Sequence, residues 1–308
     1  MFKIILIQFI IMKKIIILSG PTASGKSSAA LHLSQYFNLE IISADSMAVY
    51  RFMDIGTDKP SISQRSLVKH YMIDVADPSE DYSVYLYSEK VKEIIDSLHK
   101  IGKIPIIVGG TGLYIESLFH SIPQTEPNWN LRKKLYDSEK ARPGILYSRL
   151  TKIDPKLSKK IDEHNIKRIV RALEIYEITG KPPSIVREEN AKNLTNYEFL
   201  KLYIDKERKK LYNNIDKRVD KMIRDGLVEE TKFLIEHRLF GKTSSKAIGY
   251  KETIDYLNGV FGWEEYMRLL KRNSRRYAKR QIIWFRRYKD FIHIKSEQEA
   301  FQLIKSFV

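Results

Sequence analysis

The stretch GPTASGKS at residues 20–27 constrains the fold more than any other part of the sequence. It matches GxxxxGK[ST], the phosphate-binding loop that joins a buried strand to a helix. Ile15 to Leu18 supplies the strand pattern, and a helix is expected from about Lys26 to Phe37. Backbone N–H groups of such a loop point at phosphate oxygens, Lys26 adds a charge, and the Ser27 hydroxyl can bind Mg²⁺. Kinases, ATPases and GTPases share this motif. The motif therefore predicts a bound phosphate compound but does not say whether it is a nucleotide such as ATP or another one.

Strand and helix patterns alternate through the first part of the chain. A second strand is expected at Glu40 to Ala44, a helix at Tyr82 to Ile101 and a third strand at Ile104 to Val108. Such alternation predicts an α/β fold with a parallel sheet. Glu116 to Leu194 shows helical patterns with Pro and Gly breaks and no strand pattern. We therefore predict a P-loop NTPase-like core and a mostly helical insertion domain.

The core domain is expected to comprise residues 12–115 and 195–308, with the insertion at 116–194. The second part of the core domain, residues 195–308, begins with a strand pattern at Lys201 to Ile204. Two long basic helices are expected next, at about Lys206–His237 and Glu264–Tyr288. An edge strand at Phe291–Lys295 and a terminal helix would complete the domain.

The composition favours a polyanionic partner. Lys and Arg number 54 against 38 Asp and Glu, a net charge of +16. Clustered Lys and Arg displace the counterions condensed on nucleic-acid phosphates, although a generally basic surface would give the same total. The chain has no cysteine, which excludes disulfides, thiolate zinc sites and cysteine nucleophiles and fits a reducing compartment such as the cytoplasm.

Residues 1–11 are apolar and resemble the core of a short signal peptide. Lys13 and Lys14 interrupt this stretch well before the ~20 residues that a membrane helix requires. Met12 opens a complete first strand, so we expect Met12 to be the functional start and no membrane partner. A transient membrane anchor is the alternative.

Asp45 directly follows the second predicted strand, in the segment DSMAVYR. Ligands bind at the carboxyl ends of strands in open α/β sheets, so Asp45 is a candidate general base or Mg²⁺ ligand. An aspartate capping a loop is equally compatible with its position alone. Thr111, in the segment GGTGLY after the third strand, would place a hydroxyl on the same rim of the sheet or simply cap a tight turn.

The segment from Lys271 to Lys289 contains nine basic residues and no acidic one among its nineteen. A solvated helix normally mixes both signs, whereas a helix of one sign with interleaved aromatic residues suits a phosphate backbone. Tyr277, Trp284 and Phe285 supply the aromatic residues. For Trp284 and Phe285 we favour a buried position over base stacking.

These motifs, in this order, resemble those of the tRNA dimethylallyltransferase (tRNA isopentenyl transferase) family. The resemblance runs from Met12 to about Tyr288. Besides the P-loop it rests on ISADSMAVYRFMDIGTDKP, IDVADPSEDYSV, PIIVGGTGLY, RIVRALEIYEITGKPPS, RVDKMIRDGLVEE, KAIGYKE and RRYAKRQIIWFR. No zinc-finger extension follows, so we expect the bacterial type of enzyme.

The resemblance implies roles for particular residues. The diphosphate of dimethylallyl diphosphate would be bound by Gly20, Pro21, Thr22, Ala23, Ser24, Gly25, Lys26, Ser27 and Arg218, with Mg²⁺ at Ser27. Asp45 would accept a proton from N6 of adenine 37 of a tRNA, beside the anticodon, and Thr111 would lie at the reacting centre. Contacts to the tRNA anticodon stem-loop are implied for Asp45, Ser46, Met47, Ala48, Thr111, Arg132, Lys167, Arg168, Ile169, Val170, Arg171, Lys246, Tyr250, Arg275 and Arg276. We expect a monomer.

Three positions depart from the family pattern. Ala48 stands where Gln is common, Ile283 where Thr is common, and His164-Asn165 where Asn-Asp is usual. The first departure puts a hydrogen bond from residue 48 to the target base in doubt. Two other functions compete with the transferase: a small-molecule kinase, which leaves the basic segment unexplained, and an ATPase-type RNA-binding protein, which leaves the GGTG turn unexplained.

Overall fold

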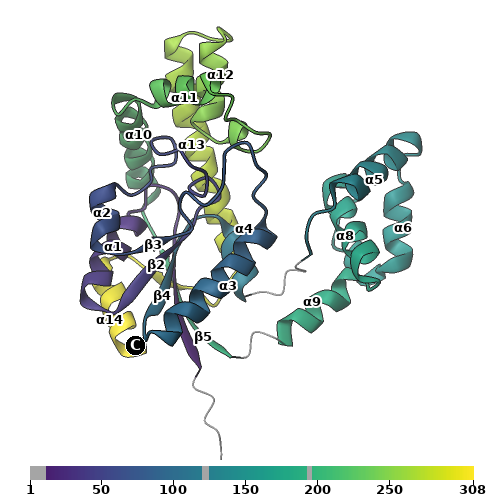
Figure 1. Ribbon diagram of the computed structural model, residues 1–308, viewed down its shortest axis with the longest axis horizontal. Helices are drawn as coiled ribbons and strands as arrows, with labels where there is room; N and C mark the ends of the chain where they lie inside the picture. Colours follow the sequence, from purple (N-terminus) through teal and green to yellow (C-terminus); the bar gives the residue numbers. More distant parts are fainter. Residues whose placement is uncertain (1–11, 120–124, 193–195) are drawn as a thin grey trace, which may run out of the picture. The chain divides into compact units, whose positions relative to one another are not determined.

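A computed structural model describes residues 12–119, 125–192 and 196–308. The expectation about residues 1–11 lies outside this part of the chain. Contacts divide the chain into two compact units, Met1–Ile115 with Tyr197–Val308, and Glu116–Asn196 (Figure 1). Within the described residues, no helix is both long and apolar enough to span a membrane.

Six parallel strands form the sheet of the first unit, in the order β3-β2-β4-β1-β5-β6. The strands are β1 (Lys13–Ser19), β2 (Leu39–Ala44), β3 (His70–Tyr71), β4 (Ile104–Gly109), β5 (Tyr197–Ile204) and β6 (Ile292–Ile294). β1 lies at the centre, where Ile16 pairs with Ile106 of β4 and with Leu200 of β5. The predicted parallel α/β sheet is confirmed.

Helices cover both faces of this sheet, which explains why its strands are continuously apolar. On one face α1 (Lys26–Tyr36) and α14 (Glu297–Phe307) pack against Ile16 and Leu18 of β1. Figure 1 shows α3 (Val84–Lys100) on the other side of the sheet. Ile15 and Ile17, which alternate with Ile16, are at most 1% exposed.

The second half of this unit differs from the prediction at one point. The single helix expected at about Lys206–His237 is two helices, α10 (Arg208–Arg224) and α11 (Leu227–Glu236). Gly226 separates them with φ of 102°, a conformation that side chains with a Cβ rarely adopt. The other elements are α2 (Ile62–Leu67), α4 (Gly112–Phe119), the 3₁₀ helix η1 (Ser244–Lys246), α12 (Tyr250–Leu257) and α13 (Trp263–Phe285).

The second unit is helical in its described part, as the pattern predicts. Its helices are α5 (Trp129–Ala141), α6 (Ile145–Ile153), α7 (Pro155–Ser158), α8 (Ile166–Thr179) and α9 (Pro183–Lys192). Apolar side chains of α5, α6 and α8 form its core, among them Leu135, Leu150 and Leu173.

Candidate functional site

The P-loop connects β1 to α1 at the carboxyl edge of the sheet. Lys26 is the first residue of α1, so the positive end of the helix dipole faces the loop. The buried hydroxyl of Ser24 has no hydrogen-bond partner among the described residues. A buried polar atom without a partner is costly, and a phosphate oxygen would satisfy it. This loop therefore has the geometry of an anion site.

A cavity of about 610 Å³ opens beside the P-loop, entirely within the unit that contains the sheet. Its lining includes Thr22, Ala23, Gly25, Lys26 and Ser27 of the loop, Asp45 to Ala48, Gly56 to Pro60, Arg218, Lys246 to Gly249, Tyr277 and Gln281. A cavity of this size accommodates a small organic ligand. The segments after β1 and β2 and two helices from the second half of the chain thus share one pocket.

Two cations meet at the P-loop end of this pocket. Arg218 of α10 donates a hydrogen bond to the Thr22 hydroxyl, and its Nε lies 3.3 Å from Oδ2 of Asp58. Burial, followed by the charge of Arg218, lowers the pKa of Lys26 to about 8. Both causes disfavour the charged lysine, so an anion bound between Lys26 and Arg218 would be strongly favoured.

Asp45 lies at the mouth of the sheet, in the same pocket. Its Oδ1 accepts hydrogen bonds from the backbone N–H groups of Met47 at 2.8 Å and Ala48 at 3.3 Å. These bonds fix the carboxylate as a loop cap would, while the side chain still lines the cavity. Oδ2 has no hydrogen-bond partner among the described residues, which leaves it available to a ligand.

Thr111 joins Asp45 on this rim. The Ser46 N–H donates to the Thr111 hydroxyl at 3.1 Å, and the Thr111 N–H donates to the Ala44 carbonyl at 3.1 Å. The turn after β4 is thereby attached to the segment that carries Asp45. These two hydrogen bonds, to the residues on either side of Asp45, hold Thr111 beside the segment that carries Asp45.

Sequence reasoning missed two residues of α13 that complete the pocket. The side chain of Gln281 accepts from the Thr22 N–H at 2.8 Å and donates to the Gly110 carbonyl at 3.0 Å. The Tyr277 side chain lines the cavity, and burial raises the pKa of its hydroxyl to about 12, so the hydroxyl stays neutral. Their spacing of four residues within RRYAKRQIIWFR places both on one face of the helix.

Several predicted tRNA contacts from the first unit need correction. Tyr250 is fully buried, and its hydroxyl donates to Oε1 of Glu230 at 2.6 Å, so it supports the pocket from inside. Ala48 lines the cavity but is only 5% exposed, which leaves little of its methyl group for RNA. Ser46, Met47 and Lys246 also line the cavity.

Acidic side chains of another helix neutralise some of the positive charges of the basic helix α13. Arg275 pairs with Asp216 of α10 at 2.5 Å, and Lys271 pairs with Asp220 at 2.6 Å. Arg276 is exposed. Phe285 is buried as expected, and Trp284 packs so closely on Gly112 that a Cβ there would lie 2.2 Å from its ring. Two aspartates of α10, a helix far from α13 in the sequence, therefore neutralise two of the basic residues that were predicted to bind phosphates.

The predicted contacts in the helical unit also divide into two groups. Lys167 and Arg168, at the start of α8, are exposed, whereas Ile169 and Val170 are buried in the core of this unit. Burial leaves the side chains of Ile169 and Val170 no surface for a contact with tRNA, whereas contacts by Lys167 and Arg168 remain a prediction.

Arg132 and Arg171 share one buried partner in the helical unit. Arg132 binds both oxygens of Glu174 at 2.8 and 2.9 Å, and Arg171 donates to one of them at 2.5 Å. The two guanidinium groups lower the pKa of Glu174 against the effect of its burial. Both arginine side chains stay partly exposed. The shared carboxylate therefore orients the two guanidinium groups and leaves part of each accessible to solvent.

For a divalent cation, the pocket offers the Ser27 hydroxyl. No group of three or more His, Asp or Glu side chains gathers as a metal site within the described ranges. Mg²⁺ in phosphate sites commonly takes one or two protein ligands and the rest from substrate phosphates and water. The donor set therefore fits a cation that binds together with a diphosphate.

Comparisons with known proteins agree with this geometry. Residues 48–288 match the model of the family described as IPP transferase. The chain is 42% identical over 291 residues to the tRNA dimethylallyltransferase of Acetivibrio thermocellus, and the match covers 93% of each chain. It is 44% identical over 280 residues to the tRNA dimethylallyltransferase of Halothermothrix orenii, and that match covers 90% of this chain and 85% of the relative. A solved tRNA isopentenylpyrophosphate transferase from Bacillus halodurans has 37% identity and a TM-score of 0.70, covering 96% of this chain and 95% of that one. A eukaryotic dimethylallyltransferase acting on tRNA has 29% identity and a TM-score of 0.77, covering 96% of this chain and 77% of that one.

Proposed function

This chain belongs to the IPP transferase family, and from that membership we propose how its pocket carries out the transfer of a dimethylallyl group to tRNA. Transfer from dimethylallyl diphosphate to tRNA is the activity of the enzyme. We propose that the acceptor is N6 of adenine 37, next to the anticodon. The observation that carries this proposal is the placement of Asp45 in one cavity with the cation pair Lys26 and Arg218.

The P-loop end of the cavity would hold the leaving group. The bond that breaks joins the allylic carbon to the diphosphate oxygen, and its electron pair leaves with the diphosphate. Lys26, Arg218 and the P-loop N–H groups would stabilise the negative charge that develops there. A Mg²⁺ ion bound at Ser27 would supply further charge neutralisation for the diphosphate.

Asp45 would act at the opposite side of the reacting carbon. The exocyclic amine of adenine is a poor nucleophile because its lone pair is delocalised into the ring. As nitrogen forms its bond to the allylic carbon, Oδ2 of Asp45 would take the N6 proton. Thr111, whose hydroxyl accepts the Ser46 N–H, would lie beside the reacting amine.

An adenine stacked in a tRNA loop must be extruded to reach this cavity. RNA loops are more easily unstacked than duplexes, which suits a single-stranded target next to the anticodon. We propose that Ser46, Met47 and Lys246 contact this nucleotide region and that Arg132, Lys167, Arg168, Arg171 and Arg276 contact tRNA elsewhere. We expect a monomer that works in the cytoplasm, where its tRNA substrate is found.

The direct test supplies the purified protein with dimethylallyl diphosphate and unmodified tRNA and measures diphosphate release. Mass spectrometry of the digested tRNA should show dimethylallyl on adenine 37. Replacing adenine 37 with guanine should abolish the product. Diphosphate release with ATP alone, or a product at another adenine, would contradict the proposal.

A further inference from the structure

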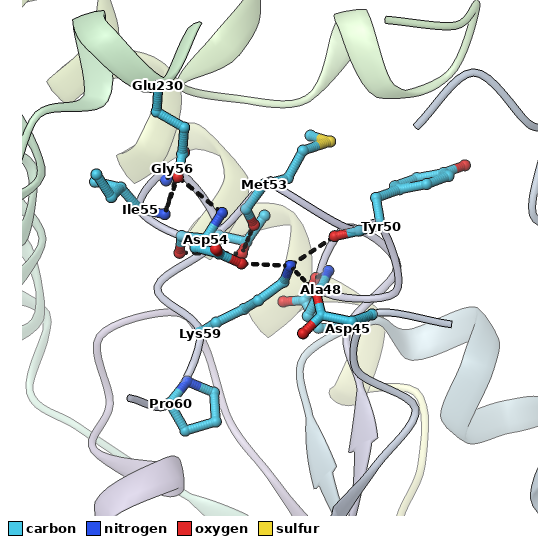
Figure 2. Close-up of polar contacts among 12 residues, drawn as sticks. Asp45, Ala48, Tyr50, Met53, Asp54, Ile55, Gly56, Lys59, Pro60 and Glu230 are labelled. Atoms are coloured by element: carbon cyan, nitrogen blue, oxygen red, sulfur yellow. Dashed lines mark hydrogen bonds and ion pairs between the residues drawn. The ribbon is translucent and has the colours of Figure 1, made fainter. Parts of the chain in front are cut away.

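Glu230 of α11 lies outside the cavity lining but contacts two of the segments that form it. Its carboxylate accepts hydrogen bonds from three consecutive backbone N–H groups, those of Asp54, Ile55 and Gly56, at 2.8 to 3.1 Å (Figure 2). Oε1 also accepts the hydroxyl proton of Tyr250, the first residue of α12, at 2.6 Å. Four donors thus converge on one side chain.

The first of these segments forms the cavity wall at Gly56 to Pro60. Within it, Asp58 has φ of 55°, a strained value for a residue with a Cβ, and its carboxylate lies 3.3 Å from Arg218. Strained backbone persists only where the surroundings hold it. Lys59 stabilises the backbone of this segment. Its buried ammonium donates hydrogen bonds to the Tyr50 carbonyl at 2.6 Å and to the Asp54 carboxylate at 2.7 Å (Figure 2).

The second segment forms the wall at Lys246 to Gly249, directly before Tyr250. Tyr250 packs so tightly on the first wall that a Cβ at Gly56 would lie 2.4 Å from its ring. The two walls therefore meet at Gly56 and Tyr250, and Glu230 binds both. No other carboxylate in the described part of the chain makes this pair of contacts.

We propose that Glu230 is a positioning residue that fixes the two walls to each other and so maintains the affinity of the pocket for its diphosphate substrate. This inference rests on the proposed function for the identity of that substrate. It acts through the backbone of residues 54–58 and, beyond them, through the contact of Asp58 with Arg218. Losing Glu230 would leave several inward-facing donors without an acceptor and release the wall beside Arg218.

Glu230→Gln tests the proposal, and Glu229→Gln is its matched control. Both glutamates lie in the first turn of α11, so each substitution removes the same charge from the same helix end, but Glu229 is exposed. We expect Glu230→Gln to raise the KM for dimethylallyl diphosphate about tenfold while kcat changes less than threefold, which corresponds to about 1.4 kcal/mol of binding. Glu229→Gln should leave both within twofold. A purely structural role would reduce the amount of active enzyme, lowering kcat and leaving KM unchanged.

The affinity for inorganic pyrophosphate, measured by calorimetry, tests whether Glu230 positions the two walls, and it does so without any transfer reaction. Weakened pyrophosphate binding in Glu230→Gln supports the positioning role even if the wild-type enzyme transfers nothing to tRNA. Tyr250→Phe, which removes one donor and keeps the ring, should weaken binding several-fold and add nothing to Glu230→Gln in the double variant. If Glu230→Gln does not fold, Tyr250→Phe alone decides. Unchanged pyrophosphate affinity in the folded variants, or full additivity in the double variant, would overturn the proposal.

Discussion

Arg275 of α13 forms an ion pair with Asp216 of α10, with 2.5 Å between Nη1 and Oδ1. Its neighbour in the sequence, Arg276, is exposed. Of two adjacent arginines of the same helix, one is thus paired and the other exposed, so the proposed contact with tRNA can be tested separately from the packing of α10 on α13.

We expect Arg276→Gln to weaken binding to all tRNAs alike, because a phosphate contact carries no sequence information. It should also flatten the slope of log affinity against log salt by about 0.7 to 0.9. Arg275→Gln should leave the slope unchanged and lower the melting temperature slightly, since its partially exposed pair contributes little. Measuring tRNA affinity across a salt series for both variants decides. An equal flattening in both variants would show that Arg275 leaves Asp216 when tRNA binds.

Asp45→Asn should slow transfer by roughly 10²–10⁴-fold, the usual range for the loss of a general base. The amide can still accept the N–H groups of Met47 and Ala48, so the loop and pyrophosphate affinity should be preserved. Single-turnover rates with saturating substrates measure the effect. Asp58→Asn removes another carboxylate from the same pocket, and we expect it to change the rate much less. A near-normal rate for Asp45→Asn would rule out its role as the base.

The affinity for dimethylallyl diphosphate should fall as the pH rises through about 8, where Lys26 of the free enzyme loses its proton. Below that value the lysine is charged and binds the diphosphate fully. Above it, binding must take up a proton, so the KM should rise by up to about tenfold per pH unit. Lys26→Arg stays charged throughout this range and should show a flat profile between pH 7 and 9. A wild-type KM that does not change from pH 7 to 9 would contradict the assignment.

Gln281→Leu should disturb the P-loop although Gln281 is far from it in the sequence. The substitution leaves the Thr22 N–H and the Gly110 carbonyl without their partner, at a cost of about 1–3 kcal/mol for each buried group. We expect a lower melting temperature together with a raised KM for dimethylallyl diphosphate. Gln281→Glu keeps the acceptor for Thr22 and should retain more affinity than Gln281→Leu. Equal KM values for the two variants would argue against the link to Thr22.

The parts of the site that the strand and helix pattern alone predicts, without the family resemblance, are those that directly follow a strand. The P-loop, Asp45 and Thr111 each come after a buried aliphatic run, and parallel strands bring their carboxyl ends to one edge of the sheet. Local pattern and topology together were therefore sufficient for these residues.

The remaining parts depend on pairs that are distant in the sequence. Gln281 reaches Thr22 across 259 positions, and Glu230 reaches Asp54 across 176. The neutralisation of Arg275 by Asp216 likewise depends on how two helices pack, which residue spacing within one helix does not determine. The burial of Ile169 and Val170 follows from the helical repeat of α8, whereas the family resemblance implied tRNA contacts for the whole run Lys167 to Arg171 without separating its faces.

The order of the strands has a consequence for biosynthesis. β1 is complete at Ser19 and gains β4 as a neighbour at Gly109, but its other edge stays unpaired until β5 ends at Ile204. At roughly 5–20 residues per second, the ribosome takes about 5 to 20 seconds to produce the intervening segment, which contains the helical unit. For that interval the β5-facing edge of this apolar strand presents unpaired backbone N–H and C=O groups, to which a strand of another chain could pair. The helical unit has an apolar core of its own, and collapse on that core would keep the segment from competing for the open edge. Mutations that weaken this core should therefore increase dependence on chaperones during synthesis.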